Sequence, residues 1–343
     1  MSRHVVITAG VRTAIGTFGG ALSGHAPSEL GALVVGEALN RAGLPAAEVG
    51  HVVFGNVILT ESKDAYLARV AAIEAGIPVE IPAMTLNRLC GSGVQAIISA
   101  AQAIMLGDCE TAVAGGAETM SRAPHLLATA RFGQRMGDAV VADHLTGVLT
   151  DPFGNGIMGI TAENVAERYG IDREAQDAFA AESQRRAAEA IAAGRFKEQI
   201  LPVEVRKGRD TISFDTDEHP KPATTAESLK GLRPTFKKDG TVTPGNASGI
   251  NDGAAAMVLM EEGGASREGK PVLARLVGYA HAGVEPGVMG IGPVPAVQAL
   301  LKRTGLALGD FDVIESNEAF AAQACAVAKE LGFDPARVNP NGG

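Results

Sequence analysis

Cys90 is the residue of this sequence best suited to covalent chemistry. It stands in TLNRLCGSGVQAI, between an apolar segment and a segment with helical periodicity. At a helix N-terminus, unpaired N–H groups and the positive end of the helix dipole favour the thiolate, which is the nucleophilic form of cysteine. Gly91 and Gly93 are expected to allow a tight turn and the close approach of a substrate. The pattern predicts a nucleophile whose own N–H helps to stabilise an oxyanion, although a small buried core residue fits the local sequence equally well.

A second motif overlaps the first. Residues 91–96 read GSGVQA and match G-x-G-x-x-A, a weak dinucleotide-binding pattern, with Asp108 and Glu110 downstream. This pattern would indicate an NAD-dependent dehydrogenase. The NRLC before the glycines is a poor strand end, however, and the two acidic residues begin the next loop. We therefore expect the cysteine, rather than a dinucleotide, to define this turn.

The two other cysteines, Cys109 and Cys325, lie in apolar helical or helix-end contexts that predict core positions. An odd, sparse count of 3 cysteines without CxxC or His pairing argues against a disulfide framework and a zinc site. We expect no metal and a reducing compartment, the cytoplasm.

Two further segments carry polar groups suited to a site. Asn317 begins NEAF directly after the strand-like DVIES, and α/β sheets place their sites at the carboxyl ends of strands. Its amide can hold a water or polarise a carbonyl, but Asn before an Ala-rich helix is more often a helix N-cap. The Gly- and Asn-rich segment 243–256 contains Ser248 and reads equally well as a ligand-lining loop and as a plain turn.

Charge and hydropathy disfavour several classes of function. The net charge of −9 and the pI near 5.4 argue against a general nucleic-acid or membrane-surface role. The first residues, MSRHVVITAGVRTAIG, lack the apolar core of a signal peptide, and we expect no window long enough to span a membrane. These features predict a soluble cytoplasmic protein.

Short apolar runs alternate with longer amphipathic segments along the chain. HVVITAG, HVVFGNVI and TAVAGGAE are typical of strands, and SELGALVVGEALNRAG and GVQAIISAAQAIMLG are typical of helices. Such alternation predicts an α/β protein with a parallel or mixed sheet covered by helices.

A helix–loop–strand unit recurs in the sequence. EALNRAGL (37–44) resembles ALLKRTGL (299–306), and each is followed by an acidic residue and a strand-like run, EVGHVVFGN (48–56) and DFDVIESN (310–317). Chance similarity between two amphipathic helices is the simpler alternative. We favour an internal duplication that gives two related α/β halves.

The sequence between the two halves differs from them in composition. A long polar-faced helix is expected to begin after Asp172 as N-cap and to end at Gly194. We predict an inserted loop subdomain at 121–249. The predicted domains are residues 1–120 with 250–271 for the first half, 121–249 for the loop subdomain and 272–343 for a second half that is incomplete.

Six segments together resemble the thiolase family, in the family's order and across residues 1–343. They are NRLCGSG, GGAETMSRAP, GITAENVA, GNASGINDGAAA, GIGPVPA and NEAFAAQA. The resemblance is closest to bacterial acetyl-CoA acetyltransferases and short-chain β-ketothiolases. It implies the thiolase fold, with two duplicated, layered α/β halves plus a loop subdomain, and a homodimer or homotetramer. It also implies a ping-pong acyl transfer whose substrates are acetyl-CoA, acyl-CoA and 3-ketoacyl-CoA, with no other cofactor.

The resemblance also assigns roles to single residues. Cys90 matches the acylated nucleophile, and Asn317 matches the residue that holds an oxyanion-hole water, which weakens the helix-cap interpretation. Phe236 matches a position near the adenine, and Lys221 falls where relatives often carry Arg near the nucleotide. The positions implied along the pantetheine channel of CoA are Met158, Ser248, Ala319 and Phe320.

The sequence departs from the family pattern in two places. Ile157-Met158-Gly159 stands where the biosynthetic branch has His-Met-Gly, which leaves longer or branched acyl groups open as substrates. After NPNGG the family continues to a Gly-His-Pro and a Cys-x-Gly-x-Gly segment that supply the base of the first step and the acid/base of the second. None of the 7 histidines here occupies a matching position. A chain ending at Gly343 is therefore expected to be nearly inactive, and a non-catalytic homologue that binds CoA thioesters stays as the alternative.

Overall fold

The computed structural model describes residues 3–343. The chain folds into two compact units, which are described separately. The first contains the chain up to Leu145 with Lys197–His219 and Ile250–Leu276, and the second contains Thr146–Phe196, Pro220–Gly249 and Val277–Gly343. The predicted division into two duplicated halves and a loop subdomain at 121–249 stays a prediction.

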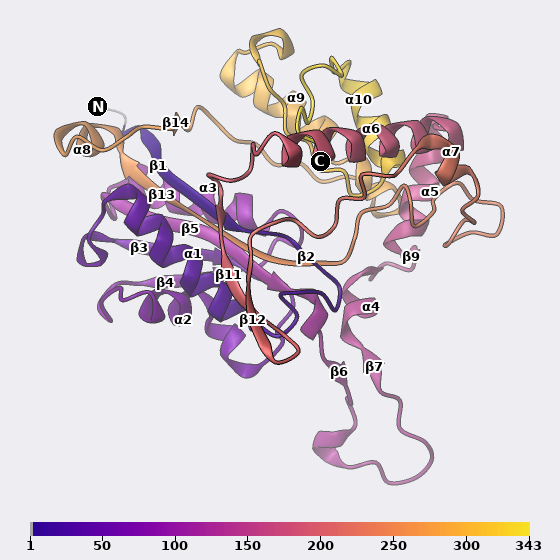
Figure 1. Cartoon of the computed structure of the whole chain (residues 1–343), viewed down its shortest axis with the longest axis horizontal. Helices are drawn as coiled ribbons and strands as arrows, with labels where there is room; N and C mark the ends of the chain where they lie inside the picture. The colour runs from indigo at the N-terminus through magenta and orange to yellow at the C-terminus, as the bar shows by residue number, and fades with distance from the viewer. Residues whose placement is uncertain (1–2) are drawn as a thin grey trace. The chain divides into compact units, whose positions relative to one another are not determined.

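The first unit is built on one mixed eight-stranded sheet (Figure 1). Its central path runs in the order β10 (Ile200–Leu201), β1 (Val5–Thr13), β13 (Asn251–Glu261), β5 (Thr111–Thr119), β3 (His51–Gly55) and β4 (Ala83–Leu86). β14 (Ala274–Arg275) also pairs with β1, and β2 (Gly16–Thr17) pairs with β13. β3 is parallel to both β4 and β5, whereas β13 is antiparallel to β1 and β5. The predicted α/β class and mixed sheet are confirmed.

Helices pack on both faces of this sheet. Because successive side chains of a strand point to opposite faces, Val53 and Phe54 of β3 mark the two sides. Val53 belongs to a cluster with α3 (Ser92–Leu106), whereas a Cβ on Gly31 of α1 (Pro27–Ala42) would meet the Phe54 ring at 3.7 Å. α1 also packs on α2 (Leu67–Glu74). The helices predicted at 28–43 and 93–107 are therefore confirmed as the layers that cover the sheet.

One expectation about hydropathy is wrong. Leu89–Leu106 is long and apolar enough to cross a membrane by length and composition. Its apolarity has another cause in this fold, because the Ala-rich face of α3 is buried against the sheet, with Ala96, Ala100 and Ile104 fully buried. We interpret α3 as the core helix of the first unit.

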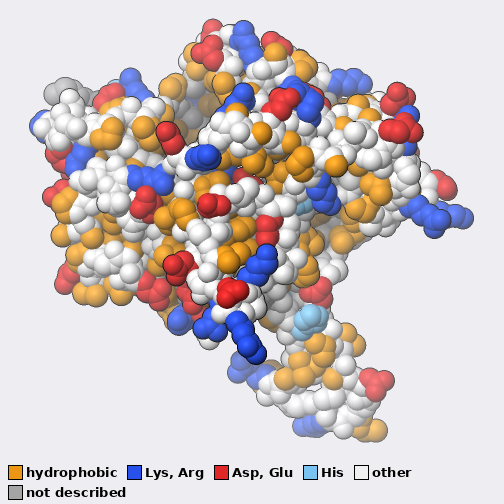
Figure 2. Space-filling model, in the orientation of Figure 1, with side chains coloured by type: hydrophobic (Ala, Val, Ile, Leu, Met, Phe, Trp, Pro, Cys, Tyr) orange, Lys and Arg blue, Asp and Glu red, His pale blue; other side chains and the backbone are white. Residues whose placement is uncertain are grey.

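Two hairpins extend from the first unit. β11 (Val203–Lys207) pairs with β12 (Asp210–Phe214), and β6 (His125–Leu126) pairs with β7 (Ala142–Asp143). The β6–β7 arm reaches away from the sheet (Figure 1), and apolar side chains gather on its surface (Figure 2). Phe132 is 89% exposed and Met136 is 90% exposed. α4 (His144–Val148) follows the arm, and α8 (Glu262–Arg267) follows β13.

The second unit is mainly helical. Its elements are β8 (Thr150–Asp151), β9 (Gly156–Ile157), α5 (Met158–Tyr169), α6 (Arg173–Ala192), α7 (Ala226–Lys230), α9 (Pro293–Thr304) and α10 (Ala321–Leu331). Val165 of α5, Val294 of α9 and Val327 of α10 share one buried cluster. Asp172 caps α6 as predicted, with its side chain accepting a 2.8 Å bond from the N–H of Ala175.

The strand expected at 310–317 does not form. Ile314 makes only an isolated bridge to Val338. The backbone of Ser316 is occupied by a side chain instead, since its N–H donates to Asn339 Oδ1 at 2.8 Å and its C=O accepts from Asn339 Nδ2 at 2.8 Å. A residue whose backbone groups are taken in this way cannot continue a ladder with a neighbouring strand.

Candidate active site

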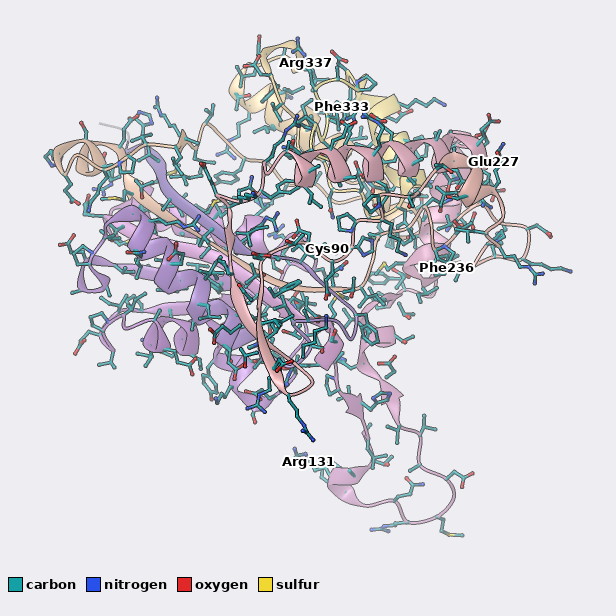
Figure 3. All side chains as sticks on the ribbon, in the orientation of Figure 1. Cys90, Arg131, Glu227, Phe236, Phe333 and Arg337 are labelled. Atoms are coloured by element: carbon teal, nitrogen blue, oxygen red, sulfur yellow. The ribbon has the colours of Figure 1, made fainter. Side chains whose placement is uncertain are left out.

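Cys90, labelled in Figure 3, lies in the turn between β4 and α3 in the first unit. β4 ends at Leu86, and α3 begins at Ser92 with Gly91 as its N-cap. Cys90 therefore stands one residue before the cap, and its side chain is exposed. The predicted position at a helix N-terminus is confirmed.

Neighbouring side chains hold the backbone of this turn. The N–H of Leu89 donates to Asn87 Oδ1 at 2.8 Å. Ser92 Oγ accepts from the N–H of Arg88 at 2.8 Å and donates to the C=O of Leu89 at 2.6 Å. Because Ser92 is only 5% exposed, the backbone of the turn is fixed against a buried group.

The left-handed residue of this turn is not a glycine, and the predicted approach of a substrate to Gly91 and Gly93 stays a prediction. Leu89, with φ +45°, is the residue that adopts the left-handed conformation, while Gly91 has φ −86°. A Cβ on Gly93 would meet nothing within 4 Å. The turn thus depends on the hydrogen bonds of Asn87 and Ser92 to keep a non-glycine residue in an unfavourable conformation.

The close approach between strand and helix occurs at Gly55, which sequence reasoning missed. A Cβ there would lie 2.6 Å from Ser92 Cβ and 2.8 Å from the Ser92 carbonyl carbon, which no real contact tolerates. Gly55 ends β3, so the first turn of α3 rests directly on the end of that strand. A glycine inside an otherwise apolar strand was the available signal for such an approach.

Glu118 supports the loop that follows β3 and was also missed. Its carboxylate accepts from the N–H of Val57 at 2.9 Å, from the N–H of Ile58 at 3.1 Å and from Asn56 Nδ2 at 3.2 Å. Burial raises the pKa of Glu118 to about 7, and the nearby carboxylates of Asp64 and Asp252 act in the same direction.

The other two thiols are poor nucleophiles. Cys109 packs against the α3 cluster, and Cys325 packs among the apolar residues of α5, α9 and α10. Burial raises the pKa of each of these thiols to about 11. Both are half-buried against a core cluster rather than fully inside it, and Cys90 is the exposed cysteine of the three.

The second unit gathers most of the positions that the resemblance connects with CoA. The ring of Phe236 meets the ring of Phe320 edge-on, with centroids 6.3 Å apart. The N–H of Ser248 donates to the C=O of Ala319 at 3.0 Å, so the two segments run side by side. Met158 begins α5, and a Cβ on the next residue, Gly159, would lie 2.2 Å from the Phe236 ring.

Lys221 does not belong to this group of contacts. Its side chain is exposed, and its backbone N–H donates to Gln184 Oε1 at 2.7 Å. The structure therefore supplies a positive charge at the surface.

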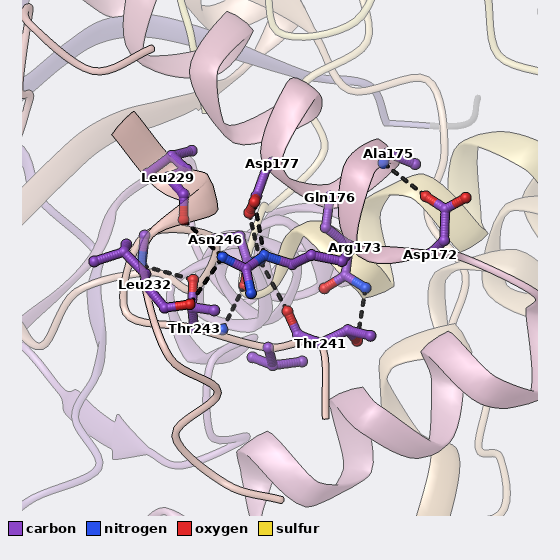
Figure 4. A network of polar contacts seen from close by, with 12 residues as sticks. Asp172, Arg173, Ala175, Gln176, Asp177, Leu229, Leu232, Thr241, Thr243 and Asn246 are labelled. Atoms are coloured by element: carbon purple, nitrogen blue, oxygen red, sulfur yellow. Dashed lines mark hydrogen bonds and ion pairs between the residues drawn. The ribbon is translucent and has the colours of Figure 1, made fainter. Parts of the chain in front are cut away.

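A buried polar network positions the segment that leads to Ser248 (Figure 4). Asp177 accepts from Asn246 Nδ2 at 2.9 Å and pairs with Arg173 at 2.6 Å. Glu163 accepts from the N–H of Thr241 at 2.9 Å and from the N–H of Val242 at 2.8 Å. Since both carboxylates are nearly fully buried, breaking either set of bonds would leave a buried charge unsatisfied.

Asn317 is not a helix cap. α10 begins at Ala321 with Phe320 as its N-cap, so the more common local interpretation of Asn317 is wrong. The side chain of Asn317 is exposed and forms no hydrogen bond with any residue in the range 3–343. Asn317 belongs to the second unit, whereas Cys90 belongs to the first. The second unit also holds the Phe236 group, which consists of Phe236, Phe320, Ser248, Ala319 and Met158.

No group of three or more His, Cys, Asp and Glu within residues 3–343 is arranged to hold a metal ion. The predicted site residues themselves offer an exposed thiol, an exposed amide and an apolar pair of rings.

Comparison with known protein families shows which family these residues belong to. Residues 5–263 match the model of the thiolase N-terminal domain, and residues 270–343 match the model of the thiolase C-terminal domain. The chain belongs to the thiolase family. This thiolase is an acyl-CoA:acetyl-CoA C-acyltransferase, and the dehydrogenase suggested by GSGVQA is excluded.

Individual relatives cover nearly all of this thiolase. It is 61% identical to beta-ketothiolase BktB of Cupriavidus necator over 100% of this chain and 87% of that protein. It is 54% identical to an acetyl-CoA acetyltransferase of Pseudomonas aeruginosa, over 99% of this chain and 87% of that protein.

Solved structures agree with the fold. The acetyl-CoA acetyltransferase of Bacillus anthracis matches with a TM-score of 0.97 at 48% identity, over 99% of this chain and 86% of that one. Human mitochondrial 3-ketoacyl-CoA thiolase in complex with CoA matches with a TM-score of 0.95 at 43% identity, over 99% of this chain and 86% of that one. The predicted thiolase fold is confirmed.

Proposed function

We propose that Cys90 is the residue that carries the acyl group in this thiolase. Its Sγ attacks the thioester carbonyl of an acyl-CoA, the bond from that carbonyl to the CoA sulfur breaks, and CoA leaves as the thiol. The α-carbon of a second acetyl-CoA then forms a C–C bond to the acyl carbon as its α-proton departs and the bond from that carbon to Sγ breaks; the Cys90 thiolate that leaves takes up this proton, which regenerates the thiol. The observation that carries the proposal is the exposed thiol one residue before the cap of α3, in a family whose chemistry needs one.

Asn317 is proposed to hold the water that stabilises the oxyanion. Support comes from its exposed amide, which has no partner among residues 3–343 and so keeps both its donors and its acceptor for a ligand. A preorganised donor of this kind acts on charge that develops in the transition state.

We further propose that CoA runs along the Phe236 group. The edge-to-face rings of Phe236 and Phe320 offer an apolar wall, and the strand-like pairing of Ser248 with Ala319 offers backbone groups beside it. Met158 is proposed to extend this wall, and the charge of exposed Lys221 suits a phosphate of the nucleotide. The substrates are then acetyl-CoA, acyl-CoA and 3-ketoacyl-CoA, with no additional cofactor.

Ile157 is proposed to favour acyl groups bulkier than acetoacetyl. It is half-buried as the N-cap residue of α5, directly before Met158, and it presents an apolar side chain where an imidazole would be polar. The ratio of turnover on 3-ketovaleryl-CoA to that on acetoacetyl-CoA should fall by about 10-fold in Ile157→His. Equal ratios in the two proteins would refute the preference.

The assembly and location are proposed as a homodimer or homotetramer in the cytoplasm. The β6–β7 arm supports self-association, because it exposes Phe132, Met136 and Val140 without a covering element in the described range 3–343. Light scattering should give a mass of two or four chains. Asp in place of both Phe132 and Met136 should lower that mass, and a monomeric parent protein would refute the assembly.

The test of the proposed chemistry is the intact mass of the natively expressed protein before and after acetyl-CoA. An acetyl adduct on a Cys90 peptide, absent from Cys90→Ser and retained in Cys109→Ser, is the expected result. Tight binding of CoA without any adduct would instead favour a homologue that binds CoA thioesters without turnover. An adduct on another residue would overturn the role of Cys90.

A further inference from the structure

Asn339, near the end of the second unit, is an asparagine with unusual backbone geometry. It is 2% exposed and has φ +44°, a left-handed conformation that Asn tolerates better than most residues. Neither feature is needed by a surface turn. A buried amide in a strained backbone is retained where its hydrogen bonds specify the geometry of something else.

The hydrogen bonds of Asn339 reach the residues on both sides of Asn317. Asn339 Oδ1 accepts from the N–H of Ser316 at 2.8 Å, and Nδ2 donates to the C=O of Ser316 at 2.8 Å. Nδ2 also donates to Glu318 Oε1 at 2.6 Å. One side chain therefore fixes the residue before Asn317 through its backbone and the residue after it through its carboxylate.

The same contacts are anchored to α6. Glu318 Oε2 accepts from Ser183 Oγ at 2.5 Å. Arg186 donates to the C=O groups of Val338 at 2.6 Å and Asn339 at 3.3 Å. Ser183 and Arg186 lie on one stretch of this helix, so the Asn317 turn and the Asn339 turn are held against a common rigid element.

We propose that Asn339 is a positioning residue for the amide of Asn317. This inference rests on the proposed role of Asn317 as the holder of the oxyanion water. With Asn339 in place, the backbone of Ser316 and the side chain of Glu318 are both held, which restricts the path of the exposed residue 317 between them. Without the Asn339 side chain, the turn around Asn317 loses the hydrogen bonds that hold Ser316 and Glu318 in place. A displacement of about 1 Å at a catalytic group can lower the rate by roughly 100-fold.

The test is a double-mutant cycle on the kcat of thiolysis of acetoacetyl-CoA by the complete gene product. Asn317→Ala should lower kcat by roughly 10²–10³-fold, as expected for an oxyanion donor. Asn339→Ala should lower kcat by roughly 10–100-fold. If Asn339 acts through Asn317, adding Asn339→Ala to Asn317→Ala should lower kcat by less than about threefold, because the two losses overlap.

Two further variants separate positioning from a general structural role. Asn339→Asp keeps the left-handed tolerance and the acceptor for Ser316 but loses both donors, so it should lower kcat and leave the affinity for CoA within about twofold. If Asn339→Ala does not fold, Asn339→Asp takes its place in the double-mutant cycle. Asn341→Ala is the matched control, because the side chain of Asn341 accepts a surface hydrogen bond from Arg195, and it should retain the parent kcat.

The outcomes distinguish the two proposals. A parent-like kcat in Asn317→Ala would refute the role of Asn317 itself. A low kcat in Asn317→Ala, combined with an undiminished loss from Asn339→Ala in that background, would leave Asn317 in place and overturn the positioning role. Loss of CoA affinity in Asn339→Asp equal to its loss of kcat would also overturn it, since a merely structural residue affects both.

Discussion

The turns that present Cys90 and Asn317 are built in different ways. The Cys90 turn is held by Asn87 and Ser92, its own near neighbours in the chain. The Asn317 turn is held by Asn339, which is 23 residues further along than the Ser316 that it binds. The first geometry can form as soon as the strand–turn–helix segment does. The second exists only after the chain has folded back on itself.

The two turns share one device. Each places a non-glycine residue in the left-handed region, Leu89 at φ +45° and Asn339 at φ +44°. In the first turn the strained residue precedes the proposed nucleophile, and in the second it supplies the supporting side chain. Both regions thus use hydrogen bonds to stabilise a conformation that costs about 1–2 kcal/mol for an ordinary side chain.

The thiols give the largest expected contrast between the two regions. With a pKa of about 11, Cys325, on the helix that follows Asn317, is only about 0.1% thiolate at pH 8. Iodoacetamide should therefore alkylate exposed Cys90 at least about 100-fold faster than Cys325, as measured by peptide mass spectrometry. Cys90→Ser should lose the fast phase. Comparable rates at the two thiols in the native protein would contradict this contrast.

Gly55→Ala should damage the Cys90 turn. The added methyl would lie 2.6 Å from Ser92 Cβ and would push the first turn of α3 from the end of β3. We expect a loss of about 3 kcal/mol in the free energy of unfolding, measured with urea, and slower alkylation of Cys90. Gly93→Ala is the matched control, because nothing lies within 4 Å of its added methyl. Unchanged stability in Gly55→Ala would mean that the strand and helix are not in contact there.

The carboxyl group of Glu118 should make the first unit sensitive to pH. Its pKa is about 7 in the folded protein and about 4.5 when unfolded, so the folded state binds the extra proton between these values. Stability from this group is complete below pH 4.5 and is lost as the pH rises toward 7, with a total of about 3 kcal/mol. Urea unfolding at pH 5, 6, 7 and 8 should show this decline in the parent and a flatter profile in Glu118→Gln. Identical slopes would refute the assignment.

The sequence predicts those helices, strands and caps that are determined by residues close together in the chain. The strands at β1, β3 and β5, the helices α1 and α3 and the Asp172 cap follow from periodicity and capping within a few residues. Cys90 at the start of α3 follows from the same kind of signal.

The remaining features depend on contacts between distant segments. Gly55 matters because Ser92 arrives beside it, and 310–317 is not a strand because Asn339 takes the backbone groups of Ser316. Periodicity carries no information about either partner. The left-handed residue of the Cys90 turn is Leu89, which hydrogen bonds from both sides hold, and no local pattern marks it.

The smallest expected effect concerns that strained residue. Leu89 is 50% exposed, so its side chain gains little from burial, and Asn tolerates the left-handed conformation better. Leu89→Asn should therefore stabilise the protein by about 0.5–1 kcal/mol in urea unfolding, and it would make the Cys90 turn resemble the Asn339 turn. Leu106→Asn is the control, since Leu106 is exposed at the end of α3 without positive φ and should gain nothing. Destabilisation by Leu89→Asn would mean that the leucine side chain itself supports the turn, so that the two left-handed residues are alike in backbone only.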